Sequence, residues 1–392
     1  MILIAVLVIL TLLLALGLSA PASLGVAALA GALMLGERFL AIVPSQVFGL
    51  LSNWVLIAVV LFLLYGRLCI EMGVRARLAR TLASLFGGSA TATLAAEVIA
   101  GLFQPDVGGE GFLQRNDEAA ATTNRLQQAG MAPWKAIGLA GVMACLRLLT
   151  PPSVFLIVAA LLLDVSIANL FLAIAPLVVG AGALLIVMGA ATPSRSAGPP
   201  RVEAAAADIA VLLWIMAPVV ILGAIWLGFF TPGEAGALGV VFALFLGLIE
   251  QQLTPGRLLR AGLDTLQDSG AIVIVFAFAS LLISVINLDG SAPQLKAQIE
   301  SLPVAWIGFV AIVIAIVLAT ALLGPLVAMF IVLPLAFQIA TPSALTTPST
   351  VTQIPVVVAY STAITMGLLL PPTGPVFATL VAGTTDSVAK AI

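Results

Sequence analysis

The sequence contains no histidine, two cysteines and few charged residues. Without histidine, a Ser-His-Asp triad, a histidine-ligated zinc and a histidine proton relay are all excluded. Cys69 and Cys145 lie in separate apolar stretches, so neither a disulfide framework nor a metal cluster is indicated. No basic or acidic tail is present and the net charge is only -2, which gives no sign of a nucleic-acid partner. An enzyme is therefore the least favoured class.

Apolar residues dominate what is present. Of 392 residues, 62% are hydrophobic and 8% are charged, whereas roughly a quarter are charged in a soluble domain. Stretches long enough to cross a hydrocarbon core about 30 Å thick recur along the chain. The first of them, within residues 1–20, has no basic residue before it, so we expect a retained transmembrane helix rather than a signal peptide. The sequence predicts an all-α polytopic membrane protein.

Several sequence landmarks occur twice, 220 positions apart. Residues 104–107 (QPDV) correspond to residues 324–327 (GPLV), and residues 148–153 (LLTPPS) correspond to residues 368–373 (LLLPPT). Each match is short, but their order and constant spacing favour two homologous halves.

These halves define the predicted domains. The first repeat spans residues 1–192, a cytoplasmic linker spans 193–206, and the second repeat spans 207–392. The first repeat is predicted to contain scaffold helices in 1–70, an amphipathic arm helix at 74–86, a re-entrant hairpin at 87–130, a broken helix at 134–163 and a helix at 167–190. The second is predicted to contain scaffold helices in 207–288, an arm at 292–302, a hairpin at 303–341 and a broken helix at 354–383, and to lack the last helix.

The distribution of basic residues predicts how the halves are oriented. If the basic segment from Arg67 to Arg80 is cytoplasmic, eight basic residues fall inside and two, Arg38 and Lys296, fall outside. This arrangement places the N-terminus outside and makes the two repeats inverted. Inverted repeats with discontinuous helices are typical of secondary transporters, which bind substrate between the halves.

Proline pairs predict where the helices are discontinuous. Pro151–Pro152 and Pro371–Pro372 each remove two amide donors, so carbonyls in the preceding turn are expected to lose their partners. In an apolar environment such carbonyls need another partner, which can be an ion. We therefore expect the binding site at breaks 150–153 and 370–374, together with hairpin tips 104–111 and 323–326.

Three motifs resemble one transporter family. They are residues 228–235 (GFFTPGEA), which open a helix, the break at 150–153 (TPPS), and the break at 367–374 (GLLLPPTG). With the order of the predicted helices, they make the chain similar to the large membrane (permease) subunit of tripartite ATP-independent periplasmic (TRAP) transporters.

The resemblance implies a function and partners. It implies an elevator-type, sodium-coupled importer of a small organic anion, commonly a carboxylate, with sodium as the coupling ion and no other cofactor. It also implies a multi-pass protein of the bacterial inner membrane, surrounded by lipid, with a small four-helix membrane subunit and a periplasmic substrate-binding protein as partners. The alternatives are a divalent-anion/sodium symporter without a binding protein and a non-transporting scaffold subunit.

Arg147 is the most unusual residue near the predicted breaks, because it stands where the second half has Gly367. A charge at membrane depth is costly, and a guanidinium suits a carboxylate ligand. The alternative is a permanent ion pair with Asp106 or Glu110. The candidates for substrate binding are Arg147, Gln104, Asp106, Ser153, Thr373 and Gly374.

Sodium prefers oxygen ligands, by analogy with other hard cations. The candidate sodium ligands are Asp106, Gly108, Gly109, Thr150, Ser153, Gly324, Thr365 and Thr373. The alternative for each hydroxyl is a hydrogen bond to a carbonyl one turn back, and Asp106 and Glu110 could instead carry protons.

Other polar residues, in both halves, have a structural interpretation. Glu97 is expected to make a hydrogen bond between helices, and Glu234 is expected to cap the helix that begins after Thr231. Residues 114–130 are too polar to face lipid, so they either line water or pack on protein.

Overall fold

The structure is a computed structural model that describes residues 2–36, 39, 41, 43–103, 111–191, 209–300, 305–340 and 350–370. Within these ranges every regular element is a helix and no strand occurs, which confirms the all-α prediction. Among them, α11 (Ile167–Ala191), α13 (Pro232–Ile249) and α14 (Pro255–Leu288) are long and apolar enough to cross a membrane. A fourth span results if α5 (Val55–Glu71) and α6 (Val74–Leu85), bent by 58°, count as one. The chain is thus consistent with a polytopic membrane protein.

The remaining helices are mostly shorter and apolar. They are α1 (Ile2–Ala15), α2 (Ala20–Leu35), α4 (Val43–Leu51), α7 (Ala90–Leu102), α8 (Gly111–Gln128), α9 (Pro133–Leu148), α10 (Val154–Leu163), η1 (Ile209–Ile215), α12 (Met216–Trp226), α15 (Ser291–Glu300), α16 (Ala305–Leu323), α17 (Pro325–Val327), η2 (Ala328–Val332), α18 (Leu333–Ala340) and α19 (Thr350–Gly367).

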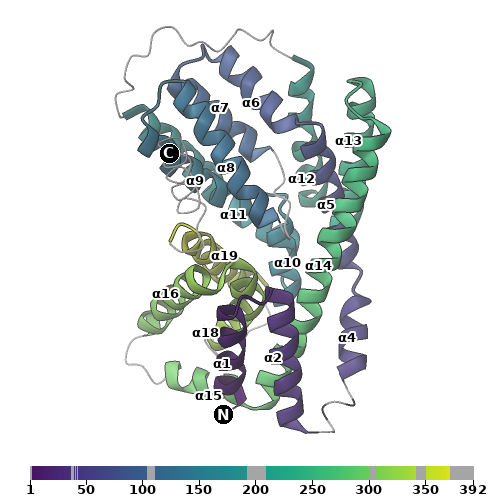
Figure 1. The fold of residues 1–392 in the computed structure, drawn as a ribbon, viewed down its shortest axis with the longest axis vertical. Helices are drawn as coiled ribbons and strands as arrows, with labels where there is room; N and C mark the ends of the chain where they lie inside the picture. The colour runs from purple at the N-terminus through teal and green to yellow at the C-terminus, as the bar shows by residue number, and fades with distance from the viewer. Residues whose placement is uncertain are drawn as a thin grey trace, which may run out of the picture.

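The long helix α14 forms the spine of the molecule, with α2 against one end and α5 against the other (Figure 1). Among the ion pairs between α5 and α14, the buried one joins Arg67 to Asp268, whose residues are 6% and 2% exposed. Helix α13 packs on α5 and begins with a capping box in which Thr231 and Glu234 bond each other's backbone N–H groups. The predicted capping role of Glu234 is confirmed.

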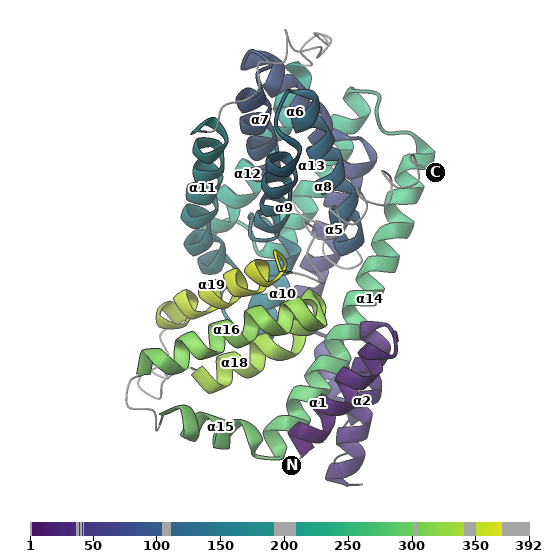
Figure 2. The same cartoon turned by 60° about the vertical axis from the view of Figure 1, so that its left-hand side comes forward.

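Helices α7, α8, α9 and α11 form a second group, and α16, α18 and α19 form a third (Figure 2). Helix α10 connects them, because it follows α9 in the chain and contacts α5, α11, α18 and α19. Its residues are almost all buried because apolar side chains surround it on every side. The first predicted break, at residues 150–153, directly precedes α10 and therefore lies where the groups meet.

Helix α6 is amphipathic, as its spacing predicts. Val74, Leu78 and Leu82 are buried, and the helix packs on α7 and η1. Leu85, expected on the same face, is instead 54% exposed because it is the last residue of the helix. On the other side, Arg77 bonds Glu250 at 2.7 Å. The apolar face of this arm thus contacts protein.

Glycine at position 367 lets α19 cross α16 closely. A Cβ atom there would lie 2.5 Å from Thr320 Cβ and 2.6 Å from the Val317 carbonyl oxygen. Both distances are far below van der Waals contact, and the carbonyl belongs to the backbone, so it cannot move aside like a side chain.

We predict that Gly367→Ala destabilises the protein by about 1–3 kcal/mol, because the added methyl overpacks this crossing. Gly138→Ala in α9 is the matched control, since no atom lies within 4 Å of a Cβ built there. The control should be neutral or slightly stabilising. Thermal unfolding of the two variants in one detergent checks this, and equal midpoints would contradict the close crossing.

Candidate functional site

Helix α9 ends at Leu148 and α10 begins at Val154, so the chain is interrupted where the first proline pair predicts a break. The prolines offer no N–H, and the five intervening residues form turns rather than helix. The break is buried, with Thr150 3% exposed and Ser153 fully covered. A polar interruption therefore lies inside an otherwise apolar bundle.

The carbonyls of the last turn of α9 do not lack partners, contrary to the expectation from sequence. Leu146 O accepts hydrogen bonds from Leu149 N at 3.0 Å and from the Thr150 hydroxyl at 3.1 Å. Leu148 O accepts one from the Ser153 hydroxyl at 2.6 Å. The two hydroxyls thus compensate for donors that proline lacks. Each hydroxyl oxygen keeps its lone pairs, which remain suitable ligands for a cation.

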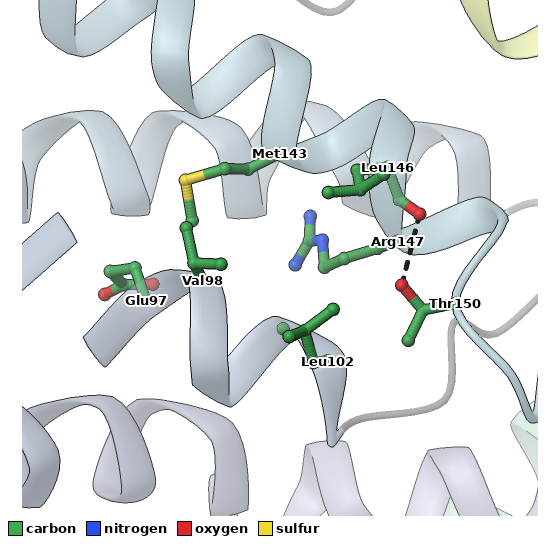
Figure 3. Close-up of a pocket in the computed structure, with 8 residues that line it drawn as sticks. Glu97, Val98, Leu102, Met143, Leu146, Arg147 and Thr150 are labelled. Atoms are coloured by element: carbon green, nitrogen blue, oxygen red, sulfur yellow. Dashed lines mark hydrogen bonds between the residues drawn. The ribbon is translucent and has the colours of Figure 1, made fainter. Parts of the chain in front are cut away.

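Arg147 projects from α9 into the space between α9 and α7 (Figure 3). It is 5% exposed, and its Cδ would lie 3.4 Å from a Cβ built on Gly101 of α7. The adjoining cavity measures about 10 Å³, room for about one water. It is lined by Glu97, Val98, Gly101, Leu102, Met143, Leu146, Arg147 and Thr150. Arg147 and Thr150, proposed for different ligands, therefore share one cavity.

Glu97 lies on the same cavity and is the centre of an ion cluster. It is 1% exposed, and its carboxylate accepts bonds from Arg125 Nε and from Arg125 Nη2, the latter at 3.1 Å. Arg75 Nη2 approaches the same carboxylate at 3.5 Å, and Thr122 donates to it at 3.4 Å. The cluster joins α6, α7 and α8. The predicted inter-helix bond of Glu97 is confirmed.

Sequence reasoning missed Arg75 and Arg125 as partners of Glu97. Arg75 belongs to an amphipathic helix whose other arginines, Arg77 and Arg80, are on more exposed positions. Its place next to Val74 on the buried side was the signal that could have found it. Arg125 was noticed as part of a polar segment, but sequence alone does not show which face of that segment meets α7.

Helix α8 packs on protein along its described side chains. Thr122, Thr123 and Leu126 are buried, and the helix contacts α9 and α7. Of the two explanations for this polar segment, packing against protein therefore holds for Thr122, Thr123 and Leu126, whereas Ala121 and Arg125 line a cavity.

The second half has its own interruption. Helix α16 ends at Leu323, and Gly324 adopts φ = +85° before α17, a conformation that favours glycine. Thr365 is 4% exposed and donates to Thr362 O at 2.7 Å. After α19 ends at Gly367, the Met366 and Gly367 carbonyls accept turn bonds from Leu369 and Leu370 N–H groups.

The structure brings part of the predicted site together. Helix α19, which carries Thr365, contacts both α9 and α10, the helices on either side of Thr150 and Ser153. Across the described ranges, no group of three His, Cys, Asp or Glu side chains could hold a metal ion. The predicted site residues outside the described ranges are Gln104, Asp106, Gly108, Gly109, Thr373 and Gly374.

We predict that Glu97→Gln destabilises the protein by about 3 kcal/mol or more, because it removes the buried carboxylate that two guanidinium groups share. Asp164→Asn is the control, since Asp164 is exposed and its left-handed backbone (φ = 53°) tolerates asparagine. Thermal unfolding of both variants checks this. A midpoint for Glu97→Gln equal to that of the control would mean that the ion cluster contributes nothing.

Comparison with known proteins gives a family match over nearly the whole chain. The family model "Tripartite ATP-independent periplasmic transporter, DctM component" matches residues 7–390. The C4-dicarboxylate TRAP transporter large permease protein DctM of Pseudomonas aeruginosa is 27% identical over 206 residues, which cover 50% of this chain and 47% of that protein. The sialic acid TRAP transporter large permease protein SiaM of Vibrio cholerae is 28% identical over 210 residues, which cover 52% and 49%. These alignments span about half the length of each relative.

Proposed function

Because the chain belongs to the DctM component family of tripartite ATP-independent periplasmic transporters, we propose that it is the large permease subunit of a sodium-coupled secondary transporter that imports a small organic carboxylate. The family is one of multi-pass permeases rather than enzymes, and the apolar helices agree with a place in the bacterial inner membrane. The names of both relatives specify carboxylate substrates, a C4-dicarboxylate and a sialic acid.

The observation that carries the carboxylate proposal is the buried guanidinium of Arg147 at the break after α9. On insertion scales an arginine near the middle of a membrane helix costs about 2.5–3.5 kcal/mol. Binding a carboxylate through paired N–H donors would explain why an arginine is present despite this cost. Gln104, Asp106, Ser153, Thr373 and Gly374 complete the proposed substrate site.

The proposed sodium site uses the oxygens freed at the two interruptions. Thr150 and Ser153 present hydroxyl lone pairs at the first break, and Thr365 and the Gly324 backbone contribute from the second half. A positive φ at Gly324 allows the backbone to approach an ion closely. The remaining proposed ligands are Asp106, Gly108, Gly109 and Thr373.

Corresponding helix crossings support the proposed inverted repeats. Arg147 passes Gly101 on α7, and Gly367, 220 positions later, passes Thr320 and Val317 on α16. In an elevator motion, the bend between α5 and α6 would let the arm swing while α6 holds α7 and α8. The proposed orientation places the N-terminus outside.

Partners complete the proposal. We expect a small four-helix membrane subunit, and a periplasmic binding protein that delivers the substrate. Exposed apolar side chains such as Leu227 (72%) and Phe229 (74%) are suited to contact with membrane lipid.

We predict that Arg147→Gln raises the substrate concentration for half-maximal uptake by roughly ten- to a hundredfold, since a hydrogen bond to a charged group contributes about 1.5–3 kcal/mol. For Arg147→Lys, this half-maximal concentration should lie between those of the unaltered protein and of Arg147→Gln, because lysine keeps the charge but loses the paired donors. The measurement is uptake of succinate and of N-acetylneuraminate into proteoliposomes that contain the chain and its partners.

Arg80→Gln is the control for this series, because Arg80 is exposed and bonds the backbone of its own helix. An unchanged half-maximal concentration in Arg147→Gln would refute substrate binding by Arg147. Uptake at full rate without the binding protein would favour the divalent-anion symporter instead.

We also predict that uptake follows an imposed sodium gradient and that Ser153→Ala raises the sodium concentration for half-maximal uptake. Alanine removes a hydroxyl oxygen at the break while changing side-chain volume little. Ser84→Ala, which removes a comparable hydrogen bond to a backbone carbonyl in α6, should leave the sodium dependence unchanged. Uptake that ignores the gradient would refute sodium coupling.

A further inference from the structure

A second cavity lies where the bend between α5 and α6 faces α8. It measures about 190 Å³, against about 10 Å³ beside Arg147. It is lined by Cys69, Ile70, Gly73, Arg75, Ala76, Ala121 and Arg125. A water needs about 10–15 Å³ of such space, so this cavity holds on the order of ten waters and is ample for a small organic anion.

The charged side chains that line this cavity, among the residues the structure describes, are both arginines. Arg75 and Arg125 come from different helices, α6 and α8, and converge on Glu97 behind the cavity wall. Glu97 does not itself line the cavity. A wall that presents two guanidinium groups attracts an anion, and their planar N–H donors match a carboxylate.

Arg125 keeps donors available for such a ligand. Its bonds to Glu97 and Thr122 use Nε and Nη2, and Nη1 makes no bond to any residue that the structure describes. The bidentate contact with Glu97 fixes the guanidinium plane before any ligand arrives, which lowers the entropy lost on binding. Glu97 is therefore a positioning residue for this cavity.

The cavity can be reached from the surface. Ile70 on its wall is 38% exposed and the Arg125 side chain is 26% exposed. Its remaining wall is formed by small residues, Gly73, Ala76 and Ala121, whose size leaves the space open.

We propose that this cavity is a second binding site for the transported carboxylate, held by Arg75 and Arg125 and separate from the break at Arg147. The proposal rests on the proposed function. Glu97 lies between the two sites, since it lines the cavity beside Arg147 and bonds both arginines of the second cavity. A carboxylate that leaves Arg147 would thus meet the next pair of guanidinium groups one helix away. Arg75, which belongs to the arm α6, would bind it directly.

Cys69 on the cavity wall provides a local test. In a Cys145→Ala background it is the sole cysteine, so the rate of its alkylation by N-ethylmaleimide reports access to the cavity. Because Cys69 is only 1% exposed, alkylation of the full chain in nanodiscs of neutral lipid should be slow but measurable, and succinate should slow it further, by severalfold. Protection should disappear in Arg125→Gln and persist in Arg80→Gln, which removes the same charge outside the cavity.

A cavity-filling variant tests the site without changing charge. Ala121→Met projects into the cavity, so equilibrium dialysis with labelled succinate should find one bound molecule per chain in this variant and two in the unaltered protein. Arg147→Gln should also retain one, at the second cavity.

Several outcomes would overturn the second site. Three of them are an unreactive Cys69, protection by succinate that persists in Arg125→Gln, and succinate binding that is unchanged in Ala121→Met. The fourth is protection of Cys69 by anionic lipid but not by succinate, which would assign the cavity to a headgroup phosphate. Each of these leaves the proposed function intact if Arg147→Gln still impairs uptake. By contrast, unchanged uptake in Arg147→Gln would refute the proposed substrate site at Arg147 and leave the second site intact.

Discussion

Peptide groups released inside an apolar bundle must find partners within the protein, because lipid offers none. At the first proline pair the partners are side-chain hydroxyls: Thr150 bonds Leu146 O and Ser153 bonds Leu148 O. This arrangement keeps a helix broken at low cost and leaves hydroxyl lone pairs facing the break.

The same constraint governs charge. Two of the buried arginines have carboxylates from other helices beside them: Arg67 has Asp268 and Arg75 has Glu97. Replacing such pairs by apolar residues is often neutral or stabilising, so stability alone does not explain them. The Arg67 pair fixes α5 on α14, whereas the Glu97 cluster fixes the arm α6 on α7 and α8. The ion pairs therefore specify which helices pack together.

Three structural units follow from these contacts. The long helix α14 with α2, α5 and α13 forms a framework, while α7, α8 and α9 form a group attached to it through α6. Helix α10 passes between this group and the helices α16, α18 and α19. Glu97 links the two candidate anion cavities: one lies between α7 and α9, and the other lies between the α5–α6 bend and α8. Proposed substrate binding and the proposed arm are thus linked by one carboxylate.

Sequence was sufficient for the features that depend on local chemistry. Composition predicted an all-helical membrane protein, Pro151–Pro152 predicted the end of α9, and Thr231 with Glu234 predicted the start of α13. Each of these follows from backbone donors, dihedral limits or hydropathy within a few residues, which is why it can be read from the chain alone.

Residues that act across helices were beyond the sequence. It drew attention to Arg147 and Glu97 separately, but not to their common cavity, nor to Arg75 and Arg125 as the partners of Glu97. For Thr150 it offered a bond to a carbonyl one turn back as an alternative, and the structure shows that bond. It could not decide between the alternatives, because the rotamers of Thr150 and Ser153 depend on packing around α10. Helical periodicity tells which face a side chain occupies, whereas the neighbour of that face is set only when the helices pack.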